Sequence, residues 1–231
     1  MGKKVAILQS NYIPWKGFFD LINMVDEFVL YDDMQYTRRD WRNRNKIKTP
    51  NGLVWLSIPV EVKGKYSQKI NETKVSEKDW AQKHWQSIVH NYSKTKYFKE
   101  YKEIFKELYL GCEEEYLSQI NYKFITAINE ILGIKTKIRW SSEFELIDGQ
   151  TQKLLGICKD CNADVYLSGP AAKDYFDAEL ARVENIKVEW MDYSGYKEYN
   201  QLHPPFEHGV SILDLIFNEG SNANKFMKSF R

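Results

Sequence analysis

Apolar residues form short runs and regularly spaced stretches along the first part of the chain. Residues 5–8 and 28–31 are continuous apolar runs, which are typical of buried strands. Between them, over residues 18–25, apolar side chains recur at helical spacing. The pattern therefore predicts a strand, a helix and a second strand, and such a unit joins two parallel strands of a sheet.

The rest of the chain continues this alternation, interrupted by one long helical stretch. Residues 53–62 predict a third strand, and residues 76–132 predict roughly three helices that begin at a capping box over 76–79. Further strands are expected at 137–140, 165–167 and 186–190, and further helices around 154–157, from Pro170, and over 211–217 up to Gly220. We therefore predict an α/β fold: a Rossmann-like, three-layer α/β/α arrangement with a mainly parallel sheet. Residues 1–231 are expected to form a single domain with a helical insertion at approximately 76–132.

Composition and charge narrow the class of protein. A hydrophobic content of 43% and a charged content of 28% exclude disordered and collagen-like chains. The net charge is only +1, so no overall field favours RNA or DNA, and no stable nucleic-acid partner is expected. Three cysteines are too few to cross-link 231 residues, which favours a reducing, cytoplasmic location. No apolar run reaches the length of a transmembrane segment, and no signal peptide is recognisable.

The densest candidate chemistry follows the second predicted strand. Residues 38–48 contain six cations and one acid, and open α/β sheets bind ligands just beyond such strand ends. Arginine forks fit phosphate oxygens, so this loop is expected to bind a diphosphate. The residues proposed here are Arg39, Arg42 and Arg44 for the diphosphate, Trp41 or Tyr36 for stacking on a base or sugar, and Asn43 for hydroxyls. The alternative is an ordinary solvated charged loop.

A second candidate stretch, residues 9–19, joins the first predicted strand to the first helix. A helix N-terminus offers free N–H donors to an anion, and Gln9, Tyr12 and Trp15 are the substrate-binding candidates here. The stretch is similar to the opening of nucleotidyltransferases, but Trp15-Lys16-Gly17-Phe18 lacks both histidines that hold the triphosphate there. Adenylyl transfer by that device is therefore not expected. The alternative role for Trp15 is packing of the helix.

A third candidate stretch, residues 167–173, has a strand, a Ser-Gly turn and a helix beginning at Pro170. Ser168 is expected either to contact a ligand or to cap that helix, and Lys173 is a further substrate-binding candidate. No Gly-x-Ser-x-Gly elbow surrounds Ser168, so a nucleophilic role is disfavoured.

Candidate bases and metal ligands are sparse. His203, in a loop before the last helix, and Asp33, after the second strand, are the alternatives for a general base, because a loop histidine titrates near working pH. An ordinary structural role for His203 is the alternative. A metal-dependent hydrolase built on Asp32 and Asp33 is disfavoured, because adjacent strand residues point to opposite faces. No zinc signature is present, and the Cys158-x-x-Cys161 pair is expected to be buried structure.

Several of these blocks together resemble the WbqC-like family of bacterial proteins. They are the 8–19 stretch, Tyr31-Asp32-Asp33, Trp41-Arg42-Asn43-Arg44, residues 55–60, Tyr166-Leu167-Ser168-Gly169 and Gln201-Leu202-His203. The resemblance implies a role in the biosynthesis of O-antigen lipopolysaccharide and other surface polysaccharides. It also implies transfer of glycine or another acyl group to an amino sugar.

The resulting hypothesis is an N-acyl- or aminoacyltransferase that acts on a nucleotide-linked amino sugar. The reaction needs a base for the amine proton and donors for the developing oxyanion. An acyl-thioester, an aminoacyl-tRNA and an ATP-activated acid all remain open as the donor, and the cofactor is otherwise unknown. The alternative hypothesis is a non-catalytic module that binds a nucleotide sugar or glycan in the same pathway.

Overall fold

A five-stranded sheet lies at the centre of the chain, of which the computed structural model describes residues 2–230. Its strands, in spatial order β5-β2-β1-β6-β7, all pair in parallel. Their bounds are β1 Lys4–Leu8, β2 Glu27–Leu30, β5 Lys137–Trp140, β6 Val165–Ser168 and β7 Lys187–Trp190. The predicted α/β class with a mainly parallel sheet is confirmed.

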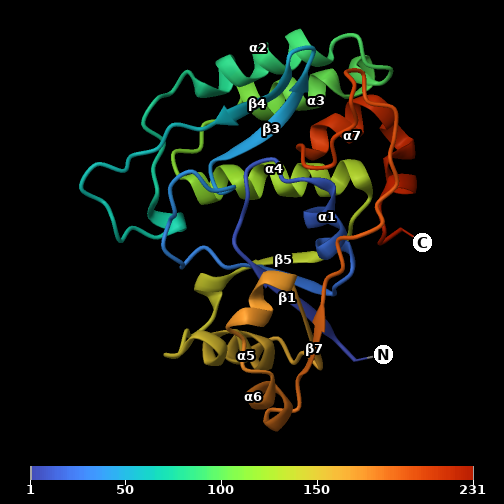
Figure 1. Ribbon diagram of the computed structural model, residues 1–231. Helices are drawn as coiled ribbons and strands as arrows, with labels where there is room; N and C mark the ends of the chain where they lie inside the picture. Colours follow the sequence, from blue (N-terminus) through green and yellow to red (C-terminus); the bar gives the residue numbers. More distant parts are fainter. Residues whose placement is uncertain (1, 231) are drawn as a thin grey trace.

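Helices cover both faces of this sheet, because its central strand β1 is apolar on both sides. Val5 and Ile7 of β1 pack into one hydrophobic cluster, and Ala6 between them packs into another. The first cluster is closed by α5 (Gln150–Asp160) and α6 (Ala178–Val183), and the second by α1 (Lys16–Asn23) and α4 (Leu117–Leu132). Figure 1 shows the resulting layers, with α5 and α6 below the sheet and α1 and α4 above it.

Three more helices extend the side that carries α4. They are α2 (Trp80–Tyr92), α3 (Phe98–Leu110) and α7 (Ile212–Glu219), and all contribute to the larger cluster. The helical stretch begins later than the sequence suggests, because the predicted capping box over 76–79 does not form. Asp79 precedes α2 without capping it, and its carboxylate instead pairs with the Lys83 ammonium at 2.9 Å. None of the helices within residues 2–230 is both long and apolar enough to cross a bilayer.

The basic segment and the predicted third strand form a hairpin rather than a loop and a sheet strand. β3 (Arg44–Thr49) pairs antiparallel with β4 (Gly52–Ser57), apart from the central sheet. The expectation that residues 53–62 form one long strand is therefore wrong. Gly52, with φ +103°, accepts the backbone geometry of the tight turn. Charged side chains hid β3 from pattern analysis, because its partner strand, and not apolar alternation, stabilises it.

The short final connections also differ from expectation. Residues 170–174 form a 3-10 helix, η3 (Pro170–Asp174), rather than the start of an α-helix. The α-helix, α6, begins only after Asp177, whose carboxylate accepts a hydrogen bond from the Leu180 N–H at 3.0 Å. This cap fixes the start of α6 and leaves Gly169 and η3 at the end of β6.

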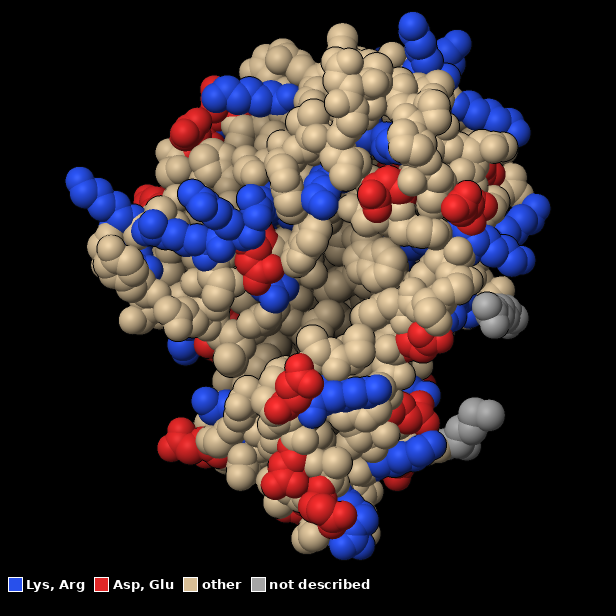
Figure 2. All heavy atoms as spheres, in the orientation of Figure 1, with Lys and Arg blue, Asp and Glu red and all other residues tan. Residues whose placement is uncertain are grey.

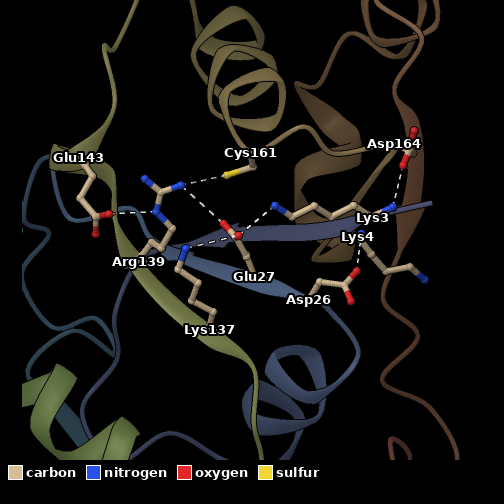
Figure 3. A network of polar contacts seen from close by, with 9 residues as sticks. All are labelled: Lys3, Lys4, Asp26, Glu27, Lys137, Arg139, Glu143, Cys161 and Asp164. Atoms are coloured by element: carbon tan, nitrogen blue, oxygen red, sulfur yellow. Dashed lines mark hydrogen bonds and ion pairs between the residues drawn. The ribbon is translucent and has the colours of Figure 1, made fainter. Parts of the chain in front are cut away.

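Ion pairs close the amino edge of the sheet. Glu27, at the start of β2, accepts a hydrogen bond from the Lys3 ammonium at 2.9 Å and lies 3.6 Å from both Lys137 and Arg139. Figure 3 shows these cations converging on Glu27, with Arg139 also reaching Glu143. The opposite, carboxyl edge carries the polar loops in which the candidate ligand residues lie.

Candidate ligand-binding site

A crevice opens at the carboxyl edge between β1 and β6. From β1 the chain continues toward β2, and from β6 toward β7 on the other side, so these neighbouring strands form a topological switch point. Ligands of open α/β sheets bind at such points. The crevice has a volume of about 510 Å³, and its lining includes Gln9, Tyr31, Arg42, Lys153, Ser168 and Tyr175. Figure 2 shows this face hollowed between the part that carries the hairpin and the part that carries α5 and α6.

Arg42 organises one wall of the crevice. Its guanidinium donates hydrogen bonds to Gln9 Oε1 and Asn11 Oδ1, and lies 3.6 Å from the Asp40 carboxylate. The backbone is held as well, because the Asn121 amide donates to the Arg42 carbonyl at 2.9 Å. Its buried Nε makes no hydrogen bond within the described residues. A fixed guanidinium with one unused N–H is well suited to an anionic ligand.

The two aspartates that follow β2 lie in separate networks. Asp32 is buried and accepts hydrogen bonds from the Ser10 N–H at 2.8 Å and from the Ser118 hydroxyl. Burial raises the pKa of Asp32 against the lowering effect of these donors and of Arg42. Asp33 instead accepts a hydrogen bond from the Ser141 hydroxyl at 2.6 Å and does not line the crevice.

The N-terminus of α5 forms the facing wall. Gly149, with φ +99°, allows the chain to turn into the helix, and Gln150 and Lys153 of the first turn line the crevice. The exposed N–H groups and the dipole of a helix N-terminus favour an anion there. Lys153 forms no ion pair within residues 2–230, and no carboxylate of that range lines the crevice. Within residues 2–230, the charged side chains that line the crevice are therefore both cations, Arg42 and Lys153.

This wall and the tyrosines beside it, Tyr31 and Tyr175, are not among the candidates that the sequence predicts. Their sequence signals are weak, because no capping side chain marks the start of α5 and because Tyr31 ends an apolar run that predicts a strand. Gly149 directly before a periodic stretch is the feature that could have located the helix start. Ser168 does line the crevice, but it does not cap the following helix, whose N-cap is Gly169. Lys173 does not line the crevice, and its ammonium lies 5.7 Å from the Trp190 ring centre.

A second cavity of about 500 Å³, here called the aromatic cavity, lies beyond Arg42. Its lining includes Asn11, Trp15, Trp41, Tyr193, Tyr196 and His208. The Trp15 ring packs 5.2 Å from Tyr193 and 5.5 Å from Tyr196, measured between ring centres. Trp15 thus does both things that the sequence allowed: it packs at the start of α1 and it lines a cavity.

His208 lines this cavity, although no sequence pattern marks it as a candidate. Its buried Nδ1 makes no hydrogen bond within the described part of the chain. Burial and the nearby positive charge of Lys16 lower the pKa of His208, so its imidazole is neutral at pH 7. Only the tertiary structure brings His208 to the cavity, because residues 193–209 form a connection without regular structure that returns to the loop after β1.

Other predicted ligand residues lie in the core or on the hairpin. Tyr12 is fully buried, and its hydroxyl donates to Tyr109 at 2.9 Å and lies 2.8 Å from His84 Nδ1. Tyr36 is also buried. The Arg44 guanidinium stacks 4.1 Å from the Trp55 ring centre and donates to the carbonyl of Arg39.

The remaining candidates are likewise committed to the protein's own backbone or surface. Asn43 donates its amide to the Ile58 carbonyl at 2.7 Å, and Arg39 is exposed with φ +59°. His203 Nε2 lies 3.1 Å from the Asn91 carbonyl of α2 and lines neither cavity. His203 and Asp33 are therefore not brought together.

Metal and thiol chemistry find no support in the described residues. No group of three metal-ligating side chains occurs among residues 2–230. Cys158 and Cys161 are free and buried, as predicted. Burial raises their thiol pKa values to about 12 and about 11, which disfavours thiolate chemistry.

Comparison with known proteins agrees with the resemblance in the sequence. The model of the WbqC-like protein family matches residues 9–226. The chain belongs to this family. This WbqC-like protein is also 48% identical over 229 residues to Rv1507c of Mycobacterium tuberculosis (strain ATCC 25618 / H37Rv), an uncharacterised protein, with 99% of each chain covered. No solved structure matches it.

Proposed function

We propose that this WbqC-like protein binds a nucleotide-linked amino sugar in the crevice and transfers an acyl or aminoacyl group to its amine. The observation that carries the binding half is the cation-lined crevice at the switch point of the sheet. There Arg42, Lys153 and the N-terminus of α5 face one cavity that no carboxylate of residues 2–230 lines. A diphosphate supplies the matching charge.

The crevice offers a partner for each part of such a ligand. The diphosphate lies between the unused Arg42 Nε–H, the Lys153 ammonium and the first turn of α5. The base stacks on Tyr31 or Tyr175, and Gln9 and Ser168 reach hydroxyl groups. These roles extend the diphosphate assignment that the sequence suggested for Arg42.

The transfer half rests on family membership and on the resemblance to proteins of surface-polysaccharide biosynthesis, including O-antigen biosynthesis. His203 and Asp33 stay predictions as the general base. The acyl-thioester, aminoacyl-tRNA and ATP-activated acid stay open as donors. A cytoplasmic location is proposed with this role, because sugar nucleotides are made and used there.

A non-catalytic nucleotide-sugar-binding role is the second candidate function. It is favoured by the crevice lining, in which no histidine or carboxylate of the described range 2–230 stands ready to accept the amine proton. Both functions predict the same ligand and differ only in turnover.

Calorimetric titration with UDP, dTDP and GDP and with their amino-sugar forms tests the binding half. We expect Lys153→Ala to weaken the tightest of these ligands about tenfold, which is about 1.4 kcal/mol, because a charge-assisted contact is lost. Lys159→Ala removes the same charge from the same helix, where Lys159 pairs with Glu184 at 2.5 Å, and is expected to change affinity less than twofold. Equal losses in both variants, or no binding of any nucleotide, would refute the crevice assignment.

Mass spectrometry of the bound amino sugar tests the transfer half. The protein is incubated with the ligand and, in turn, an aminoacyl- or acyl-thioester, aminoacyl-tRNA, and ATP with free acids. An acylated amine with one donor supports the transferase. Binding without product for all donors supports the non-catalytic module.

A further inference from the structure

We propose that the aromatic cavity binds the sugar ring of the ligand whose phosphates occupy the crevice. This assignment deepens the proposed function and rests on it. The two cavities have nearly equal volumes, about 510 and 500 Å³, and each is large enough for a substantial part of a small molecule. The crevice holds the charged part of the ligand, and the aromatic cavity holds the uncharged ring.

Arg42 is the junction between the linings of the two cavities. Its guanidinium bonds Gln9, which lines the crevice, and Asn11, which lines the aromatic cavity. In the chain, Trp41 lines the aromatic cavity and the next residue, Arg42, lines the crevice. When Arg42 holds a diphosphate in the crevice, the group bonded to that diphosphate extends across this junction toward the aromatic cavity.

The walls of the aromatic cavity suit a pyranose. Within residues 2–230 no Lys, Arg, Asp or Glu side chain lines it, which disfavours phosphate and carboxylate groups. Trp15, Trp41 and Tyr193 present large aromatic surfaces against which the C–H face of a sugar ring packs. Asn11 at the junction and His208 at the wall supply the few polar contacts that orient such a ring.

His208 provides the most direct evidence for a ligand in this cavity. A buried polar atom ordinarily has a hydrogen-bond partner, and His208 Nδ1 has none within the described chain. A hydroxyl or amine on the sugar would satisfy it. The Asn45 amide is by contrast already used, because it donates to the Tyr12 and Ile13 carbonyls at 3.2 and 2.9 Å.

Lys16 places an ammonium behind this wall, and burial lowers its pKa to about 8, so it is mainly protonated at pH 7. It is buried, donates to the Lys197 carbonyl at 3.1 Å and lies 5.0 Å from the Tyr196 ring centre. This charge disfavours a second cation nearby.

The test compares each nucleoside diphosphate with its amino-sugar form. The ratio of the two dissociation constants measures what the sugar adds, and for the best-bound of the UDP, dTDP and GDP pairs we expect at least about tenfold. His208→Gln and Tyr193→Leu are expected to reduce this ratio at least fivefold and to leave the affinity for the nucleoside diphosphate within twofold. His90→Gln, at an exposed position of α2, is the matched control and is expected to leave both unchanged.

Tryptophan fluorescence supplies a second readout, because Trp15 and Trp41 line the aromatic cavity. The amino-sugar form is expected to change the emission in wild type, and the nucleoside diphosphate alone is not. A ratio near one, or a ratio that neither variant reduces, overturns the sugar assignment while leaving nucleotide binding intact. Absence of nucleoside diphosphate binding overturns the proposed function itself, so the two failures are distinguishable.

Discussion

Arg42 combines two tasks that its neighbours in the basic segment do not share. It anchors the loop after β1 through Gln9 and Asn11, and it lines the crevice with a buried Nε that makes no hydrogen bond within the described residues. Burial lowers the pKa of Arg42, but the neighbouring Asp40 and Asp32 counter this, and an arginine stays charged. Among the six cations of residues 38–48 it is the one whose side chain lines the crevice.

Tyr12, in contrast to Arg42, lies in the core and lines neither cavity. Because its hydroxyl is buried between Tyr109 and His84, Tyr12→Phe leaves both of these groups short of a partner. We expect the free energy of unfolding to fall by about 1–3 kcal/mol, with ligand affinity unchanged. Urea unfolding measures the first and calorimetric titration the second.

Tyr66→Phe is the control for this prediction, since Tyr66 is 77% exposed. We expect it to change the unfolding free energy by less than about 0.5 kcal/mol. A loss of affinity in Tyr12→Phe without a loss of stability would restore Tyr12 as a ligand residue, as the sequence suggested.

At the scale of elements, the hairpin with its approach segment and α5 decide which side chains face the two cavities. Within 39–44 the sequence predicted several phosphate ligands, but the approach to β3 directs Trp41 and Arg42 to different cavities and stacks Arg44 on Trp55. The pattern marked the segment as a whole. It did not reveal the direction of each side chain, because the direction of Arg42 depends on its long-range partners Gln9, Asn11 and Asn121.

Gly149 tests whether the start of α5 shapes the crevice. Its φ of +99° is strained for any other residue, and an added Cβ would lie 2.2 Å from the Gln152 side chain. We expect Gly149→Ala to cost about 1–3 kcal/mol of unfolding free energy and to weaken nucleotide binding, because Gln150 and Lys153 follow directly. Thermal unfolding and calorimetric titration measure the two effects.

Gly156, in the same helix, is the matched control. An added Cβ there meets only the Ile147 side chain at 3.6 Å, an ordinary contact. Gly156→Ala is expected to raise stability by up to about 1 kcal/mol and to leave binding unchanged. If Gly149→Ala and Gly156→Ala had the same effect on stability and binding, the role of Gly149 in shaping the crevice would be disproved.

In the whole molecule, the two edges of the sheet have different roles. The amino edge is closed by the ion pairs around Glu27 (Figure 3). The carboxyl edge carries the crevice. Substitutions at the amino edge should therefore change stability and leave ligand binding alone.

Glu27→Gln is the test of this separation. Burial acts to raise the pKa of Glu27, but the hydrogen bond and charge of Lys3, with Lys137, outweigh it and lower the pKa. The ionised carboxylate therefore stabilises the fold above the unfolded pKa, and this contribution is lost as pH falls through the lower folded pKa. We expect Glu27→Gln to cost about 2 kcal/mol at pH 7, a difference that shrinks under acid conditions.

Glu179→Gln is the control, because Glu179 and its partner Arg182 are 77% and 74% exposed. We expect it to cost less than about 1 kcal/mol. Chemical unfolding between pH 7 and pH 3 measures both variants. A change in nucleotide affinity in Glu27→Gln would show that the edges are coupled.

The sequence by itself determined the α/β class, most elements of the parallel sheet and the ends of the strands that border the crevice. It could do so because apolar periodicity follows directly from which faces of a strand or helix are buried. Gln9, Arg42 and Ser168 are predicted from their residue types and their places after predicted strands, and all three line the crevice.

Only the tertiary structure decided which of the remaining candidates face a cavity. Tyr12 is indistinguishable in sequence from a ligand residue, and burial against Tyr109 and His84 places it in the core. Conversely, Lys153 and His208 reach the cavities from distant parts of the chain. Which side chains meet depends on how the layers pack and how the connections return, and these long-range contacts leave no periodic signal in the sequence.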